Sequence, residues 1–180
     1  MPKQRILPFI LLGIIDCHPQ ITGKGITNEF NTEIGDFWKA SHSQIYPELK
    51  RMVADKWITV TQNDDNAKEK YYNLTAEGLE VLNNWLTQAV TKLPIHQDLF
   101  SLKLFFIKQA NDPRIKDLIT RQINLLKQEL DHLLERKELI FSKQAMIDNH
   151  YGHYLVLTRA ISRTQGQLKW LNEELNKLNK

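Results

Sequence analysis

The chain of 180 residues is 42% hydrophobic and 25% charged, a composition typical of a soluble globular protein of one domain or two small ones. Its net charge of +3 is a weak indication of an anionic partner. Its single cysteine, Cys17, excludes an internal disulfide and a cysteine-based zinc site, and it fits a reducing cytoplasm.

The apolar stretch from Ile6 to Ile15 predicts a first helix, over about residues 5–16, that is central to a small core. This stretch is too short to span a bilayer, and it lacks the features of a signal peptide. We therefore expect a cytoplasmic protein with no membrane partner. A second helix is expected to begin near Thr22, a good N-cap residue, and to close at Gly35.

The segment from Asp36 to Met52 predicts a third, amphipathic helix that reaches about Lys56. Its apolar residues recur at helical spacing and predict a buried stripe of Ile45, Leu49, Met52 and Val53. Ser41 with Gln44 fits a capping box, although Ser43 is a rival N-cap. The opposite face of the helix then presents Ser41, His42, Gln44, Tyr46, Pro47, Lys50 and Arg51. Such groups are typical either of an ordinary capped surface helix or of a helix that reads base edges and phosphates in the major groove.

A β-hairpin and a fourth helix follow. Residues 57–62 alternate in polarity as a half-buried strand does, residues 63–66 form a turn cluster, and residues 68–74 return as a second strand before Thr75 caps the helix. The order helix, helix, helix, hairpin, helix predicts a winged helix-turn-helix domain over residues 1–92. Lys68 and Lys70, near the hairpin tip, suit phosphate contacts, or else a solvated loop.

Charge limits how this domain could bind DNA. Residues 1–92 carry ten Lys/Arg and eleven Asp/Glu, whereas residues 93–180 carry fourteen and ten. Bulk charge therefore gives no support for DNA binding by the first domain, and binding must depend on a few placed groups.

Residues 93–180, beyond the Leu93-Pro94 boundary, are expected to be all helical. Two apolar series advance by alternating steps of four and three, on either side of a turn near residues 148–152. The first series is Ile119, Ile123, Leu126, Leu130, Leu133 and Ile140, with Lys137 filling the one polar slot. The second is Tyr154, Leu157, Ile161, Thr164, Leu168, Leu171, Leu175 and Leu178. The two helices could pair with each other, but seams this long favour an intertwined homodimer, so the predicted class is mainly α with a C-terminal coiled-coil-like dimerisation domain.

Catalytic and metal-binding patterns are weak. Glu129 and His132 match one copy of an E-x-x-H motif, but carboxylate-bridged metal sites need two copies and further glutamates. His150 and His153 lack enough partners to complete a zinc site. The sequence contains no nucleophile elbow, phosphate-cradling loop or dinucleotide fingerprint, so we expect no enzymatic activity, no cofactor and no metal.

The chain resembles the PadR family of transcriptional regulators. The segments that carry the resemblance are 37–38, 41–50 and 71–78 in the first half, and 102–106 and 152–160 in the second. The long second half is similar to the subgroup that represses phenolic acid decarboxylase genes, rather than to the shorter multidrug-responsive members.

The resemblance implies a homodimeric repressor that binds a palindromic promoter site in double-stranded DNA and is released by a hydroxycinnamic acid such as p-coumarate or ferulate. A phenolic acid needs an aromatic-lined slot and a cationic or hydrogen-bonding group for its carboxylate. Residues of these types predict the effector site: Lys103, Phe105, Phe106, His150, Tyr151, His153 and Tyr154. Phe105 and Phe106 could instead be plain core, and His153 could make a structural hydrogen bond.

One segment departs from the family pattern. The family usually has Gly-Tyr-Asp-Ile at the start of the second helix, where the tyrosine often touches DNA, whereas this chain has Gly23-Lys24-Gly25-Ile26. Lys24 could replace that contact with a phosphate-directed cation, and the glycines there suggest close packing. Two other functions fit the same fold: a multidrug-responsive repressor, and a winged-helix scaffold that binds a protein partner.

Overall fold

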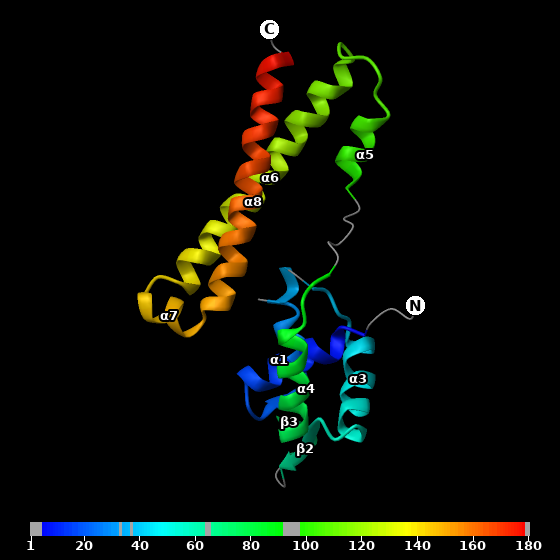
Figure 1. Ribbon diagram of the computed structural model, residues 1–180, viewed down its shortest axis with the longest axis vertical. Helices are drawn as coiled ribbons and strands as arrows, with labels where there is room; N and C mark the ends of the chain where they lie inside the picture. Colours follow the sequence, from blue (N-terminus) through cyan, green and yellow to red (C-terminus); the bar gives the residue numbers. More distant parts are fainter. Residues whose placement is uncertain (1–4, 33, 37, 64–65, 92–97, 179–180) are drawn as a thin grey trace. The chain divides into compact units, whose positions relative to one another are not determined.

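The computed structural model describes residues 5–32, 34–36, 38–63, 66–91 and 98–178, except for the side chains of residues 36, 63 and 66–68 (Figure 1). The chain divides into two compact units, Met1–Leu93 and Pro94–Lys180. Both are mainly helical, which confirms the predicted mainly α class. No helix in the described ranges has the length and hydropathy needed to cross a bilayer.

The first unit has the predicted order of three helices, a hairpin and a fourth helix. Its helical elements are α1 (Leu7–Cys17), α2 (Gly23–Glu29), the 3₁₀ helix η1 (Ile34–Asp36), α3 (His42–Ala54) and α4 (Ala76–Thr87). The N-caps predicted for α2 and α4 are confirmed, because Thr22 Oγ1 accepts the Gly25 N–H and Thr75 Oγ1 accepts the Gly78 N–H, both at 3.0 Å.

The second helix is shorter than predicted. It ends at Glu29, with buried Phe30 as its C-cap, so the prediction that it closes at Gly35 was wrong. Local hydrogen bonds complete the last turn: the Asn31 N–H and the Thr32 hydroxyl both donate to the Asn28 carbonyl. Terminal carbonyls satisfied in this way need no further helical turn.

The hairpin belongs to a three-stranded antiparallel sheet. Strands β1 (Ile21–Thr22), β2 (Ile58–Asn63) and β3 (Asn66–Leu74) lie in the order β1-β3-β2. Tyr72 of β3 lies opposite both Val60 and Ile21. The hairpin was predicted, but β1 was not, because two residues are too few to show an alternating pattern.

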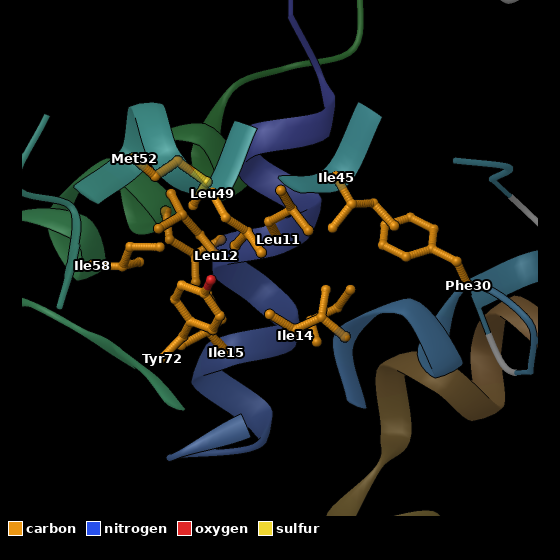
Figure 2. Close-up of a cluster of buried hydrophobic side chains, with 12 residues drawn as sticks. Leu11, Leu12, Ile14, Ile15, Phe30, Ile45, Leu49, Met52, Ile58 and Tyr72 are labelled. Atoms are coloured by element: carbon orange, nitrogen blue, oxygen red, sulfur yellow. The ribbon is translucent and has the colours of Figure 1, made fainter. Parts of the chain in front are cut away.

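A single apolar core holds the first unit together (Figure 2). Leu11, Leu12 and Ile15 of α1 are nearly inaccessible to solvent, and Ile58 and Tyr72 of the sheet complete the cluster. Of the stripe predicted on α3, Ile45, Leu49 and Met52 are fully buried, whereas Val53 is only partly buried. Each fully buried aliphatic side chain of this size contributes about 1.5–3 kcal/mol. The core therefore fixes the inner side of α3 and leaves the opposite side to solvent.

The second unit is a long helical hairpin with two short helices. It contains α5 (Leu99–Phe105), α6 (Pro113–Ile140), α7 (Gln144–Asn149) and α8 (Tyr151–Leu178). Asp112 caps α6, and Pro113 occupies its first turn, where proline is favoured. In Figure 1, α6 and α8 run side by side in opposite directions.

The two heptad stripes pack against each other within one chain. Ile119 and Ile123 of α6 meet Leu171 of α8 in one cluster, and Leu133 meets Leu157 in another. The intrachain alternative is therefore the arrangement these stripes adopt.

Candidate nucleic-acid interface and effector site

Helix α3 begins at Ser41 with the predicted capping box. The Ser41 N–H donates to Oε1 of Gln44 at 2.9 Å, and Ser41, not Ser43, is the N-cap. The Ser41 hydroxyl also lies 2.9 Å from Oγ of Ser43 and 3.0 Å from Oε1 of Gln44. All three side chains are exposed, so this linked polar group stands at the front of the helix where a base edge could meet it.

Tyr46 joins α3 to α2. Its ring is half-buried and packs against the core, and a Cβ atom at Gly23 would lie only 2.7 Å from the Tyr46 hydroxyl. The prediction that glycine here permits close packing is confirmed. The His42 ring lies over Tyr46, with centroids 4.1 Å apart. The expectation that Tyr46 simply faces solvent was wrong, because the α2–α3 contact covers part of its ring.

An open groove lies between α2 and the first turns of α3. Its lining residues come from both helices and the turn before α2: Thr22, Lys24, Gly25, Thr27, Asn28, Asn31, His42 and Tyr46. Lys24 is exposed at the start of α2. The structure therefore brings together three predicted DNA contacts, Lys24, His42 and Tyr46, along one groove.

The predicted cations of α3 and the wing are exposed where they are described. Lys50 lies on the solvent side of α3, and Lys70 lies on β3 opposite Gln62 of β2. The Lys68 side chain lies outside the described residues, so only its backbone position in β3 is known.

A buried carboxylate on α3 was not singled out from the sequence. Glu48 is 6% exposed, and it pairs with Arg5, which precedes α1, and with Nη1 of Arg51 at 3.6 Å. A buried charge is costly unless it is paired. The helical spacing could have revealed it, because Glu48 falls inside the same stripe as Ile45 and Leu49.

An aromatic cluster closes the α6–α8 hairpin at the α7 end. The Phe141 ring meets the His153 ring and the Tyr154 ring edge-on, with centroids 5.1 and 5.4 Å apart. Tyr151 stacks on Tyr154 at 6.2 Å, and Lys137 Nζ lies 5.8 Å from the Tyr154 ring centroid. The structure thus gathers three predicted effector residues with two, Phe141 and Lys137, that were not assigned to the site. His150, exposed, caps α7 nearby, and its carbonyl accepts the Tyr154 N–H.

The predicted effector residues of α5 lie elsewhere in the unit. Helix α5 packs through Phe100 onto the cluster that contains Ile119, near the start of α6. Leu133, which packs in the same cluster as Phe141 and Tyr154, lies fourteen residues after Ile119 along α6, or about 20 Å at 1.5 Å per residue. Within one chain, Lys103, Phe105 and Phe106 therefore do not join the aromatic cluster.

Phe105 and Phe106 are also not core residues. They are 80% and 69% exposed, with their rings in edge-on contact 5.5 Å apart. Exposed aromatic side chains of this size are typical of a surface that another chain or a ligand covers.

Metal binding has no support in the described part of the chain, where no three His, Cys, Asp or Glu residues are close enough to hold an ion. Glu129 and His132 are both exposed on α6, as expected for its outer face.

Comparison with known proteins gives matches over both units. Residues 11–84 match the model of the transcriptional regulator PadR-like family, and residues 97–179 match that of the virulence activator alpha C-terminal region. The chain is 32% identical over 181 residues to the negative transcriptional regulator PadR of Bacillus subtilis (strain 168), covering 98% of this chain and 99% of that protein.

Two solved structures of Bacillus subtilis PadR are similar over nearly their whole length. The crystal structure in complex with operator DNA has a TM-score of 0.86 and 33% identity, and covers 97% of this chain and 99% of that one. The crystal structure in complex with p-coumaric acid has a TM-score of 0.85 and 33% identity, and covers 98% and 100%.

Proposed function

Because the chain belongs to the PadR-like family, which consists of transcriptional regulators and not of enzymes, we propose that it is a cytoplasmic repressor of phenolic acid decarboxylase genes. The observation that carries this proposal is the full-length likeness to a protein whose crystal structures hold operator DNA and p-coumaric acid. The first unit is the DNA-binding domain, and the second is the dimerisation and effector-response domain.

In the proposed complex, α3 enters the major groove of double-stranded DNA. The exposed groups at its front, Ser41, His42, Ser43 and Gln44, face base edges and phosphates, and Lys50 supplies a cation further along. Lys24 at the α2 groove and the wing lysines, Lys68 and Lys70, bind phosphates on either side. Tyr46 acts mainly by holding α2, α3 and the His42 ring in register.

A homodimer would place two such helices on a palindromic site. Half-sites separated by one DNA turn, roughly 34 Å, require a fixed two-fold assembly. The second unit exposes large apolar side chains that a partner chain would cover: Leu99, Leu102, Phe105, Phe106, Leu125 and Leu139. We assign Lys103, Phe105 and Phe106 to this contact between chains. If a partner chain contributes to the effector site, these three residues are the ones that it would supply.

The effector is a hydroxycinnamic acid, such as p-coumarate or ferulate. Its planar ring matches the aromatic cluster around Tyr154, and the Lys137 ammonium group beside that ring can receive the carboxylate. His150, Tyr151 and His153 supply further polar contacts. Binding releases DNA if it favours a dimer geometry whose recognition helices no longer match successive major grooves.

A salt titration tests the DNA-binding half of this proposal. Fluorescence anisotropy with a labelled duplex from upstream of a phenolic acid decarboxylase gene should give an affinity that falls steeply with salt, because each phosphate contact releases counterions. An affinity for this duplex that is absent, or that does not change with salt, would favour the scaffold function and contradict the proposal.

A further inference from the structure

We propose that Arg5 and Arg51 form a second phosphate-binding site for double-stranded DNA beside α3, in which Glu48 positions both guanidinium groups. The proposal rests on the DNA-binding function proposed above. It adds Arg5 and Glu48, which were not singled out from the sequence, and it gives a role to Arg51, which the sequence placed only on a polar face.

The site is built on a buried carboxylate. Glu48 is 6% exposed on the core side of α3, and its two oxygens have different partners: Oε1 accepts from Nη2 of Arg5, and Oε2 lies 3.6 Å from Nη1 of Arg51. Removing either partner would leave a buried negative charge less compensated, which is strongly unfavourable. Glu48 therefore holds both arginines close to α3 even though their side chains extend into solvent.

The arginines keep the capacity to bind a second anion. Their side chains are 56% and 62% exposed. A guanidinium group carries five N–H donors in a fixed fork, so one edge can donate to Glu48 while another donates to a phosphate. Two cations against one carboxylate leave the cluster with a net charge of +1.

The position of the cluster complements the groove at α2. Residues of an α-helix are about 100° apart around its axis, which places Arg51 about half a turn from His42, the residue that lines the α2 groove. A helix that lies in the major groove has a phosphate backbone along each flank. Lys24 would serve one flank and the arginine pair the other. In a domain with a net charge near −1, such placed cations decide whether DNA binds.

The salt dependence of DNA affinity separates a phosphate contact from a purely structural ion pair. In the anisotropy assay, Arg5→Ala and Arg51→Ala should each make the slope of log affinity against log salt less steep by about 1. Arg5→Lys should retain the wild-type slope, because the cation remains. Arg121→Ala is the matched control: this arginine is exposed and ion-paired on α6 of the second unit, and its loss should leave the slope unchanged.

A double variant separates the loss of a phosphate contact from the loss of folding. Arg5→Ala alone leaves Glu48 less well paired, whereas Arg5→Ala with Glu48→Gln removes the buried charge together with its partner. If this folded variant, checked by its thermal unfolding, keeps the wild-type slope, the arginine site is wrong and the proposed function stands. If wild-type protein shows no salt-dependent binding at all, the proposed function fails and the arginine site fails with it.

Discussion

At the scale of single residues, the outer side of α3 contains two kinds of group that the sequence could not separate. Lys50 is exposed, whereas Tyr46 is half-buried against Gly23 and the core. Helical periodicity assigns both to the polar side, because it describes one helix and contains no information on how closely α2 approaches. Periodicity places Glu48 inside the buried stripe, but it could not show the ion pair of Glu48 with Arg5, 43 positions away in the chain.

Lys50→Ala and Tyr46→Ala should therefore behave differently. Lys50→Ala is expected to weaken operator binding and reduce the salt slope by about 1, with unfolding unchanged to within about 0.5 kcal/mol. Tyr46→Ala should weaken binding and also destabilise the first unit by about 1–3 kcal/mol, because the ring fills the α2–α3 contact. Anisotropy and chemical denaturation measure the two effects. Equal stability of the two variants would contradict the half-buried position of Tyr46.

His153 provides the residue-scale test of the effector site. Its ring meets Phe141 in the aromatic cluster and belongs to the second unit, whereas the proposed DNA contacts belong to the first. His153→Ala is expected to raise, by about tenfold or more, the p-coumarate concentration that releases DNA, while DNA affinity without effector stays at the wild-type value. Lost DNA affinity with an unchanged effector response would remove His153 from the site. Exposed His132, on α6, offers the control variant His132→Ala.

At the scale of elements, the sequence was most informative where capping and periodicity act locally. The caps at Thr22, Ser41 and Thr75 and the long α6 and α8 helices all follow from signals within a few residues. It was least informative for β1, which exists only because β3 pairs with it. Whether the heptad stripes meet within one chain or between two depends on the connecting turn, which periodicity does not describe.

The seam between α6 and α8 can be tested with two adjacent leucines. Leu133 is 2% exposed and Leu134 is 41% exposed. Leu133→Ala should destabilise the second unit by about 2–5 kcal/mol, and Leu134→Ala by much less. Because the seam lies within one chain, the loss of unfolding free energy caused by Leu133→Ala should not depend on protein concentration. A loss that grows on dilution would instead indicate a seam between chains.

The Asp112 cap of α6 makes a pH-dependent contribution to the stability of the folded protein. Hydrogen bonds from the Arg114 side chain and backbone N–H lower the pKa of Asp112 from 3.8 to about 2. A lowered pKa means that the folded state favours the carboxylate, so the stabilisation is complete above about pH 4 and is lost as pH falls toward 2. Thermal unfolding should show wild type more stable than Asp112→Asn at pH 5, with the difference shrinking toward pH 2. If the stability difference between wild type and Asp112→Asn did not change with pH, the charge on the Asp112 carboxylate would not contribute to the stability of the cap.

At the scale of the whole molecule, the fold and the regulator family could be predicted from the sequence, and the effector site only in part. The segment around His153 and Tyr154 does form an aromatic cluster, but Phe105 and Phe106 lie on a helix that packs near the other end of α6. Residue types alone indicate which groups suit a phenolic acid. They do not show which groups a long hairpin holds about 20 Å apart.

The central claim is that the protein binds DNA upstream of a phenolic acid decarboxylase gene and releases that DNA when a phenolic acid binds. The direct measurement is an anisotropy titration of the labelled upstream duplex, at fixed salt, with and without saturating p-coumarate. We expect tight binding without the acid and an affinity at least tenfold weaker with it, while benzoate, which lacks the phenol and the propenoate chain, has little effect. Tight DNA binding that p-coumarate leaves unchanged would contradict the claim.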